Sequence, residues 1–384
     1  MEAAAPALLV LIVAAIVLAV VWTRRASVPG RAPAQRTVTK VLQGALLPSQ
    51  PPVVDGLRVS WSYVAATAPD AGGGLTAIVT MNTVRQAIRA ALIDGARPAD
   101  ALRRANRVLL RSESPGIVTA TVGIIDPATL QFRYAAAGHP PPLLATAEEL
   151  CAPLPGEGSG IALGVLPHHV TSEHVVSVPV DGLLALYTDG CVSRDNDEMG
   201  GMQTFADALV QARTLAPSKP APTIDRAIFG QRERDDDATI ITIAPEPLLA
   251  HLDVRLPAEL ASAALARTAV RRFLATTPLG ERRSFDAVVA SGEAVANAIE
   301  HAYDRRPNQT FALRARWEDH VCTILIEDGG TWNDVEPLTT RGRGIAMMRE
   351  LCDTLEIDRT PAGTRVALGF QTANNVADAA LTTA

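Results

Sequence analysis

The sequence lacks most of the features that mark a disulfide-bonded, zinc-binding or nucleic-acid-binding protein. Its four cysteines (Cys151, Cys191, Cys322 and Cys352) are scattered, and their spacing matches neither a structural metal site nor a disulfide framework. The net charge is −6, whereas a domain that binds nucleic acid is usually basic. No internal repeat is present. What remains is a chain of 384 residues, which is long enough for two domains with separate hydrophobic cores.

The N-terminus carries one long hydrophobic run. Residues 3–22 contain no charge, and about twenty apolar residues span the hydrocarbon core of a bilayer. A cleaved signal peptide would need basic residues before the run, but the charged residue there is the acidic Glu2. Five basic residues and no acidic one follow at positions 23–40, so the positive-inside rule places the rest of the chain in the cytoplasm. The sequence therefore predicts a transmembrane anchor over residues 1–25 and a basic linker over residues 26–40.

Residues 41–246 alternate strand patterns with helical patterns. Apolar spacing predicts helices over residues 76–91 and 99–110, and strands over residues 117–125, 132–137, 175–178, 183–187 and 239–243. Turns rather than helices join most of these strands, so the pattern favours an antiparallel α+β sandwich over a doubly wound parallel sheet. Pro245 and Pro247 mark the boundary to a second domain, predicted over residues 250–371 and followed by a tail over residues 372–384.

The second domain contains motifs that together describe a nucleotide pocket. Glu293 and Asn297 lie four residues apart on a helix predicted over residues 286–303, so they share one face. A carboxylate beside an amide oxygen suits Mg²⁺, and Glu293 could also activate an attacking hydroxyl. A Glu/Asn pair alone more often belongs to a solvated helix face, so the prediction of a nucleotide site depends on the motifs that follow the pair.

Those motifs supply groups for a base and for phosphates. Asp328 ends a strand predicted over residues 321–327 and can accept a hydrogen bond from an adenine amino group, while Gly330 lets the backbone approach the ring. Gly342 and Gly344 open a helical pattern over residues 345–355, and the free amides at a helix N-terminus bind phosphates.

Residues 256–370 resemble the GHKL ATPase superfamily, and specifically its bacterial anti-sigma-factor serine kinase branch. The resemblance implies that Glu293 is the catalytic base and that Asn297 is the Mg²⁺ ligand. It implies further contacts to ATP from Asp328, Gly330, Gly342, Gly344 and Thr364. No separate helix with a phosphoaccepting His precedes these motifs, which argues against a sensor histidine kinase.

Residues 41–246 resemble the PPM superfamily of metal-dependent serine/threonine phosphatases, in its sporulation-phosphatase branch. The motifs that carry the resemblance, in order, are Leu42–Pro48, Ala137–Pro142, Ala162–Gly164, Tyr187–Gly190 and Asp236–Thr239. The resemblance implies that Asp189 and Asp236 bind Mn²⁺ or Mg²⁺, with Asp237 as an adjacent alternative. Carboxylates gathered at strand ends suit such hard cations.

The acids that complete the metal site in that family have no clear counterpart. Members carry a Gly-Gly-Asp motif and a second Asp-containing motif before the first long helix, whereas residues 63–77 form one Gly-rich stretch whose single acid is Asp70. Two-metal hydrolysis needs carboxylates that hold both ions. The sequence therefore predicts a degenerate, inactive phosphatase domain, with an impaired active one as the alternative if Asp70 reaches the metal.

Together these observations predict an N-terminal transmembrane helix followed by two α+β domains, a truncated PPM-like α/β/β/α sandwich and a GHKL-type α/β sandwich. The expected protein is a single-pass partner-switching regulator of the bacterial cell membrane that phosphorylates a serine of an anti-sigma-factor antagonist and thereby acts on a sigma factor. One alternative is a phosphatase of the phosphorylated antagonist with a regulatory ATP site. The other is a non-catalytic scaffold that binds the antagonist or the sigma factor. Resemblance also implies a homodimer.

Overall fold

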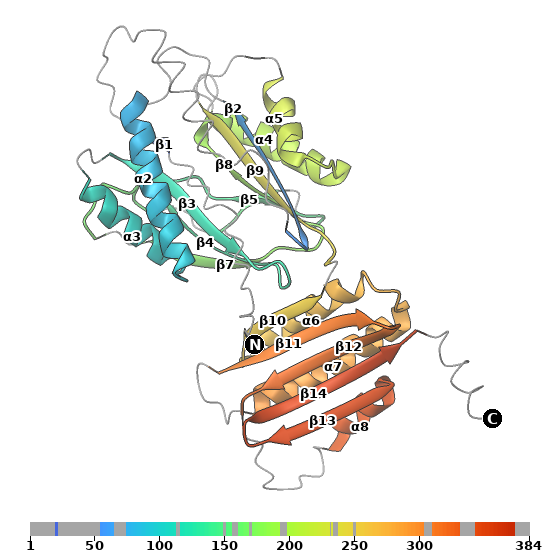
Figure 1. Ribbon diagram of the computed structural model, residues 1–384. Helices are drawn as coiled ribbons and strands as arrows, with labels where there is room; N and C mark the ends of the chain where they lie inside the picture. Colours follow the sequence, from blue (N-terminus) through green and yellow to red (C-terminus); the bar gives the residue numbers. More distant parts are fainter. Residues whose placement is uncertain are drawn as a thin grey trace, which may run out of the picture. The chain divides into compact units, whose positions relative to one another are not determined.

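The chain forms two compact units, Met1–Glu246 and Pro247–Ala384 (Figure 1). The computed structural model describes residues 20–21, 54–64, 74–112, 116–148, 151–155, 160–168, 171–192, 198–230, 232, 237–248, 251–302, 309–330 and 342–372.

The first unit contains two antiparallel sheets. One has the strand order β1-β3-β4-β7 and consists of β1 (Val20–Val21), β3 (Val118–Ile125), β4 (Gln131–Ala137) and β7 (Glu173–Ser177). The other has the order β2-β9-β8-β5-β6 and consists of β2 (Leu57–Val64), β9 (Ala238–Pro245), β8 (Leu183–Tyr187), β5 (Leu143–Ala145) and β6 (Ala152–Pro153).

Helices cover the outer face of each sheet. The helices α2 (Gly74–Ile93) and α3 (Pro98–Leu110) share a core with β3 and β4, while α4 (Glu198–Leu215) and α5 (Pro220–Phe229) share one with β8 and β9. A third core, with Val59 and Ile243 from one sheet and Phe132 and Tyr134 from the other, joins the sheets. Because β9 is covered on both faces, it is buried along almost its whole length and carries a continuous apolar run. The predicted antiparallel α/β/β/α sandwich is confirmed.

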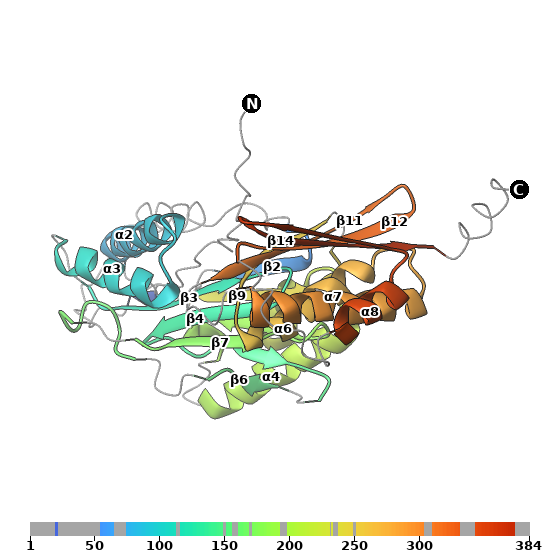
Figure 2. The ribbon, with the colours of Figure 1, turned by 90° about the horizontal axis from the view of Figure 1, so that it is seen from below.

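The second unit is one five-stranded antiparallel sheet with helices on a single face (Figures 1 and 2). Its strand order is β10-β11-β12-β14-β13, from β10 (Leu252–Pro257), β11 (Thr310–Glu318), β12 (Val321–Asp328), β14 (Gly363–Gln371) and β13 (Thr354–Thr360). The helices are α6 (Leu260–Leu274), α7 (Glu281–His301) and α8 (Gly342–Leu351). Alternation along β10, where Val254 is buried and its neighbours Asp253 and Arg255 are exposed, gives this sheet one apolar and one polar face.

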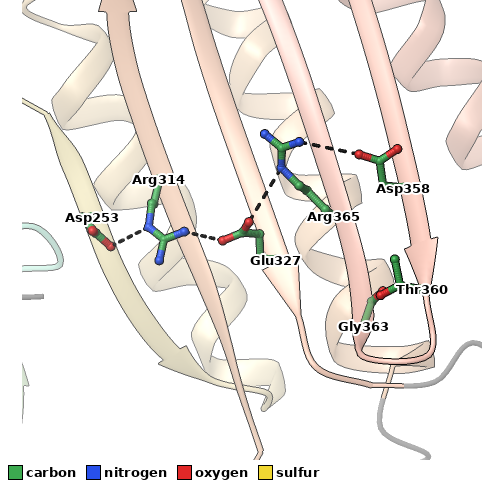
Figure 3. A network of polar contacts seen from close by, with 7 residues as sticks. All are labelled: Asp253, Arg314, Glu327, Asp358, Thr360, Gly363 and Arg365. Atoms are coloured by element: carbon green, nitrogen blue, oxygen red, sulfur yellow. Dashed lines mark hydrogen bonds and ion pairs between the residues drawn. The ribbon is translucent and has the colours of Figure 1, made fainter. Parts of the chain in front are cut away.

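A chain of ion pairs crosses every strand on the polar face of this sheet (Figure 3). Arg314 of β11 pairs with Asp253 of β10 at 3.3 Å and with Glu327 of β12. Arg365 of β14 pairs with Glu327 at 3.7 Å and with Asp358 of β13 at 3.6 Å. Charges of opposite sign therefore alternate from one edge of the sheet to the other.

The predicted transmembrane helix is wrong. Within the part of the chain that the structure describes, no helix is both long enough and apolar enough to cross a bilayer. Val20 and Val21, at the end of the predicted span, instead form β1 and pair with Thr119 and Val118 of β3. Residues 1–19 and 22–53, which include the predicted linker, lie outside the described residues. Apolar runs rich in β-branched residues suit strands as well as helices, so hydrophobicity alone did not decide between them. The predicted localisation at the cell membrane depended on this helix and stays a prediction.

Several element boundaries also differ from the sequence prediction. The helices α4 and α5 were not predicted, because the Gly-Gly pair in α4 and the prolines that begin α5 weaken the helical pattern. Gly201 is needed there, since a Cβ atom at this position would overlap the carbonyl oxygen of Val192. In the second unit α7 begins at Glu281 rather than at residue 286, and α8 ends at Leu351 because β13 follows at once.

Candidate functional site

The carboxylate of Glu293 lies against the N-terminal turn of α8. This turn contains Gly342 and Gly344, and a Cβ atom on Gly344 would overlap the Glu293 carboxylate. The glycine therefore permits a contact that no other residue allows without a shift. A partly exposed carboxylate thus stands beside the free amides of a helix N-terminus, which is where phosphate groups bind.

Asn297 follows one turn later on α7 and is partly exposed, as Glu293 is. The neighbouring Ala294, Val295 and Ala298 are buried and pack α7 onto the core, so the two polar side chains occupy the opposite side of the helix. Their oxygen atoms fit the preference of Mg²⁺ for one or two protein oxygens plus phosphates and water. The residues present therefore suit Mg²⁺ together with a nucleotide.

Asp328 ends β12 and stands opposite Thr364 of β14. Its Oδ1 accepts hydrogen bonds from the backbone N of Gly330 at 3.1 Å and of Thr364 at 3.3 Å. Burial raises the pKa of Asp328, and these two amide bonds oppose the shift. Both bonds use Oδ1, so within the described residues Oδ2 is the oxygen available to an adenine amino group.

Close backbone packing surrounds this aspartate. A Cβ atom on Gly330 would overlap the carbonyl oxygen of Ala302 at the end of α7. Gly363 has a φ of +143°, and a Cβ atom there would overlap the carbonyl oxygen of Asp328. Thr364 itself is buried. These contacts explain the glycines of the two motifs and bring α7, β12 and β14 together around Asp328.

In the first unit, Asp189 and Asp237 lie at adjacent strand ends. Asp189 follows β8 and begins a short 3₁₀ turn, Asp189–Cys191, while Asp237 directly precedes β9. Thr188 joins these ends, because its Oγ1 donates to the Asp237 carbonyl oxygen at 3.1 Å and accepts from Thr239 N at 3.0 Å. The structure therefore brings two of the predicted metal ligands to one edge of the sheet.

The neighbours of these two carboxylates differ from those of a two-metal site. Tyr63 of β2 lies beside Asp237. Burial is the main cause that raises the pKa of the Tyr63 phenol above its usual range, and the Asp237 carboxylate is the second. Among the described residues, no group of three or more His, Cys, Asp or Glu side chains is placed to hold a metal ion. The predicted ligands Asp70 and Asp236 lie outside the described residues. The two carboxylates that the structure describes at this edge are fewer than two-metal hydrolysis requires.

The sequence did not assign a role to His139, which the structure places at the centre of this strand junction. It is 3% exposed, and its Nε2 donates to the Tyr187 carbonyl oxygen at 3.0 Å while its Nδ1 accepts from Thr119 Oγ1 at 3.2 Å. Burial lowers the pKa of His139 to about 4, so the ring is neutral. His139 therefore fixes the end of β8 just before Asp189. Its place in the Ala137–Pro142 motif was the signal that could have revealed this role.

Two family models match the chain, one in each unit. A model of the histidine kinase-like ATPase domain matches residues 256–370, and a model of stage II sporulation protein E (SpoIIE) matches residues 63–246. The boundary between the matches coincides with the boundary between the compact units.

The similar proteins include two anti-sigma F factors and a solved structure of two domains. The anti-sigma F factor of Clostridium beijerinckii is 32% identical over 118 residues, which cover 27% of this chain and 82% of that protein. The anti-sigma F factor of Caldanaerobacter subterraneus subsp. tengcongensis is 36% identical over 116 residues, covering 27% of this chain and 80% of that protein. Among solved structures, the RsbU and RsbW domains of Rv1364c from Mycobacterium tuberculosis align at 24% identity with a TM-score of 0.45, over 83% of this chain and 96% of that chain.

Proposed function

Because the chain belongs to the histidine kinase-like ATPase family of the anti-sigma F factors and also carries a SpoIIE-type phosphatase domain, we propose that it is a partner-switching regulator with serine kinase activity. Its substrate is a serine of a small protein that antagonises an anti-sigma factor. The observation that carries the proposal is the contact between the Glu293 carboxylate and the first turn of α8. That contact supports the proposal, because a carboxylate there would lie beside the helix amides that are proposed to bind the phosphates of ATP.

The residues of the second unit divide the work of phosphoryl transfer. Asp328 and Thr364 hold the adenine, and the amides at the start of α8 hold the phosphates. Glu293 accepts the proton of the serine hydroxyl. The serine oxygen then bonds to the γ-phosphorus of ATP as the bond between that phosphorus and the ADP oxygen breaks. Asn297 would hold Mg²⁺, which supplies neutralisation of the phosphate charge. The chain contributes mainly positioning and electrostatics, which carry most of the catalysis in this class of reaction.

The phosphatase-like unit is proposed to be inactive. Support comes from Asp189 and Asp237, the two carboxylates that the structure describes at the β8–β9 edge, and from the Tyr63 phenol that lies beside Asp237. The same two carboxylates are also the observation that favours a second candidate function. In that function the unit is a metal-dependent phosphatase that acts on the phosphorylated antagonist. The homodimer stays a prediction.

One experiment separates kinase, phosphatase and scaffold. The full chain is incubated with labelled ATP and Mg²⁺ and with candidate antagonist proteins from the same genome, beside the Glu293→Ala variant as a matched control. We expect label on a serine of one candidate with the natural chain and not with the variant. Mn²⁺-dependent release of phosphate from a phosphoserine antagonist, without transfer from ATP, would show a phosphatase instead. Stable binding of a candidate with neither reaction would show a scaffold.

A further inference from the structure

Arg283, in the first turn of α7, joins the far end of α8 to the sheet. Its Nη1 donates to the carbonyl oxygen of Leu351, the last residue of α8, at 2.9 Å, and its Nη2 pairs with the Asp353 carboxylate just before β13. The guanidinium carbon lies 5.6 Å from the ring centre of Phe370, which is fully buried in β14. Asp353 also accepts a hydrogen bond from Gln371 N at 2.7 Å. One side chain therefore connects α7, α8, β13 and β14.

The helix α8 is thus attached to α7 at both of its ends. Gly344 packs against Glu293 at one end, and Leu351 is bonded to Arg283 at the other, so the two helices run antiparallel. The ten residues of α8 extend about 15 Å at 1.5 Å per residue. Arg283 is therefore too far from the start of α8 to touch a phosphate that binds there.

We infer that Arg283 is a positioning residue for the phosphates of ATP, an inference that rests on the ATP site proposed above. An α-helix moves nearly as a rigid rod, so holding its last carbonyl fixes the direction in which its first amides point. A cation at the C-terminus of α8 also complements the helix dipole. Without Arg283 the helix keeps its packing at Gly344 and at the buried Met348, and Asp353 keeps its backbone bond to Gly369, but the last carbonyl of α8 loses its side-chain partner. The direction of the phosphate-binding amides would then be less tightly fixed.

The adenine contacts should not depend on this attachment. Asp328 and Thr364 lie on β12 and β14, which are paired directly with each other in the sheet. Their hydrogen bond is between a side chain and the backbone of the neighbouring strand, and α8 takes no part in it. A defect that arises from α8 alone should therefore weaken phosphate binding and leave nucleoside binding intact.

The test compares adenosine with Mg²⁺-ATP on the full chain by competition against a fluorescent ATP analogue. Arg283→Met removes the charge and the hydrogen bonds but keeps most of the aliphatic packing on Phe370. We expect it to bind Mg²⁺-ATP about tenfold more weakly, and adenosine within about twofold of the natural chain. Arg282→Met, a change at the exposed neighbouring residue, should leave both affinities unchanged. Arg283→Lys keeps the charge and a single donor nitrogen but not the planar fork, so it should recover part of the lost affinity.

Two results would overturn the inference. One is Mg²⁺-ATP affinity in Arg283→Met equal to that of the natural chain. The other is an equal loss for adenosine and Mg²⁺-ATP in both Arg283 variants, which would mean that the residue supports the whole unit rather than the phosphate end. A natural chain that binds neither ligand would overturn the proposed ATP site itself, and that result is distinct from the first two.

Discussion

Replacing Asp328 by Asn and by Ala separates two roles of this residue. In the structure Oδ1 accepts two backbone hydrogen bonds, from Gly330 and Thr364, while Oδ2 is left for the adenine amino group. Asn keeps an oxygen at the position of Oδ1 but puts an amide NH₂ group at the position of Oδ2. There the NH₂ group would face the adenine amino group, which is also a donor. Asp328→Asn should therefore lose about 1–3 kcal/mol of binding free energy, or about tenfold to a hundredfold in ATP affinity, with little loss of stability.

The Ala variant loses the structural bonds as well. Leaving a buried amide without its partner costs about 1–3 kcal/mol, so Asp328→Ala should lower the free energy of unfolding by at least that amount relative to Asp328→Asn. Titration with a fluorescent ATP analogue measures the binding, and urea unfolding of the full chain, followed for the second unit, measures the stability. An Asn variant that binds ATP as the natural chain does would refute the adenine role. Equal stability of the Asn and Ala variants would refute the structural one.

Four further experiments test the remaining assignments. Glu293→Ala should leave ATP binding nearly intact while slowing phosphoryl transfer by about 10²–10⁴, the usual effect of losing a general base; lost binding with unchanged transfer chemistry would contradict the role. Asn297→Ala should weaken Mg²⁺-ATP more than metal-free ATP, and equal weakening in titrations with and without Mg²⁺ would count against a metal ligand. Burial lowers the pKa of His139 from 6.5 to about 4, so between these pH values the unfolded state binds more protons than the folded state. The free energy of unfolding of the first unit should therefore fall by about 3 kcal/mol as the pH falls from 6.5 to about 4. Urea unfolding at several pH values should show that loss in the natural chain and a flatter profile in His139→Gln. The full chain should show negligible Mn²⁺-dependent hydrolysis of a phosphoserine substrate, and robust turnover that Asp189→Ala abolishes would show that the phosphatase-like unit is active.

Much of the fold could be predicted because its strands alternate or run apolar in a regular way. The strand ends at Tyr187 and Asp328 were placed to within a residue, since a buried run followed by Asp and Gly is a clear boundary. The N-terminal run was assigned wrongly because a hydropathy pattern does not distinguish a spanning helix from a segment that pairs with a strand. The helix α4 was missed because Gly201 serves a tertiary contact with Val192, which local pattern does not report.

In the candidate site, too, some residues could be predicted from the sequence and others could not. Glu293, Asn297 and Asp328 could be found from spacing and residue type, because their chemistry is carried by their own side chains. Arg283 could not, since its partners Leu351 and Asp353 lie about seventy residues away and become neighbours only when α7 and α8 pack together. Residues that act through another element are therefore the ones that sequence patterns leave out.

The ion-pair chain on the polar face of the second sheet has a consequence for how the pocket comes to exist. Glu327 directly precedes Asp328, and Arg365 directly follows Thr364, the two residues proposed to contact adenine. The strands pair Glu327 with Arg365 and Asp328 with Thr364. A slip of β12 by one residue would turn Asp328 outward and Glu327 into the apolar core, and would also take Glu327 from between its two arginines. The alternating charges thus select one register while the sheet assembles. The proposed adenine-binding end of the site therefore depends on a register that folding sets without any nucleotide.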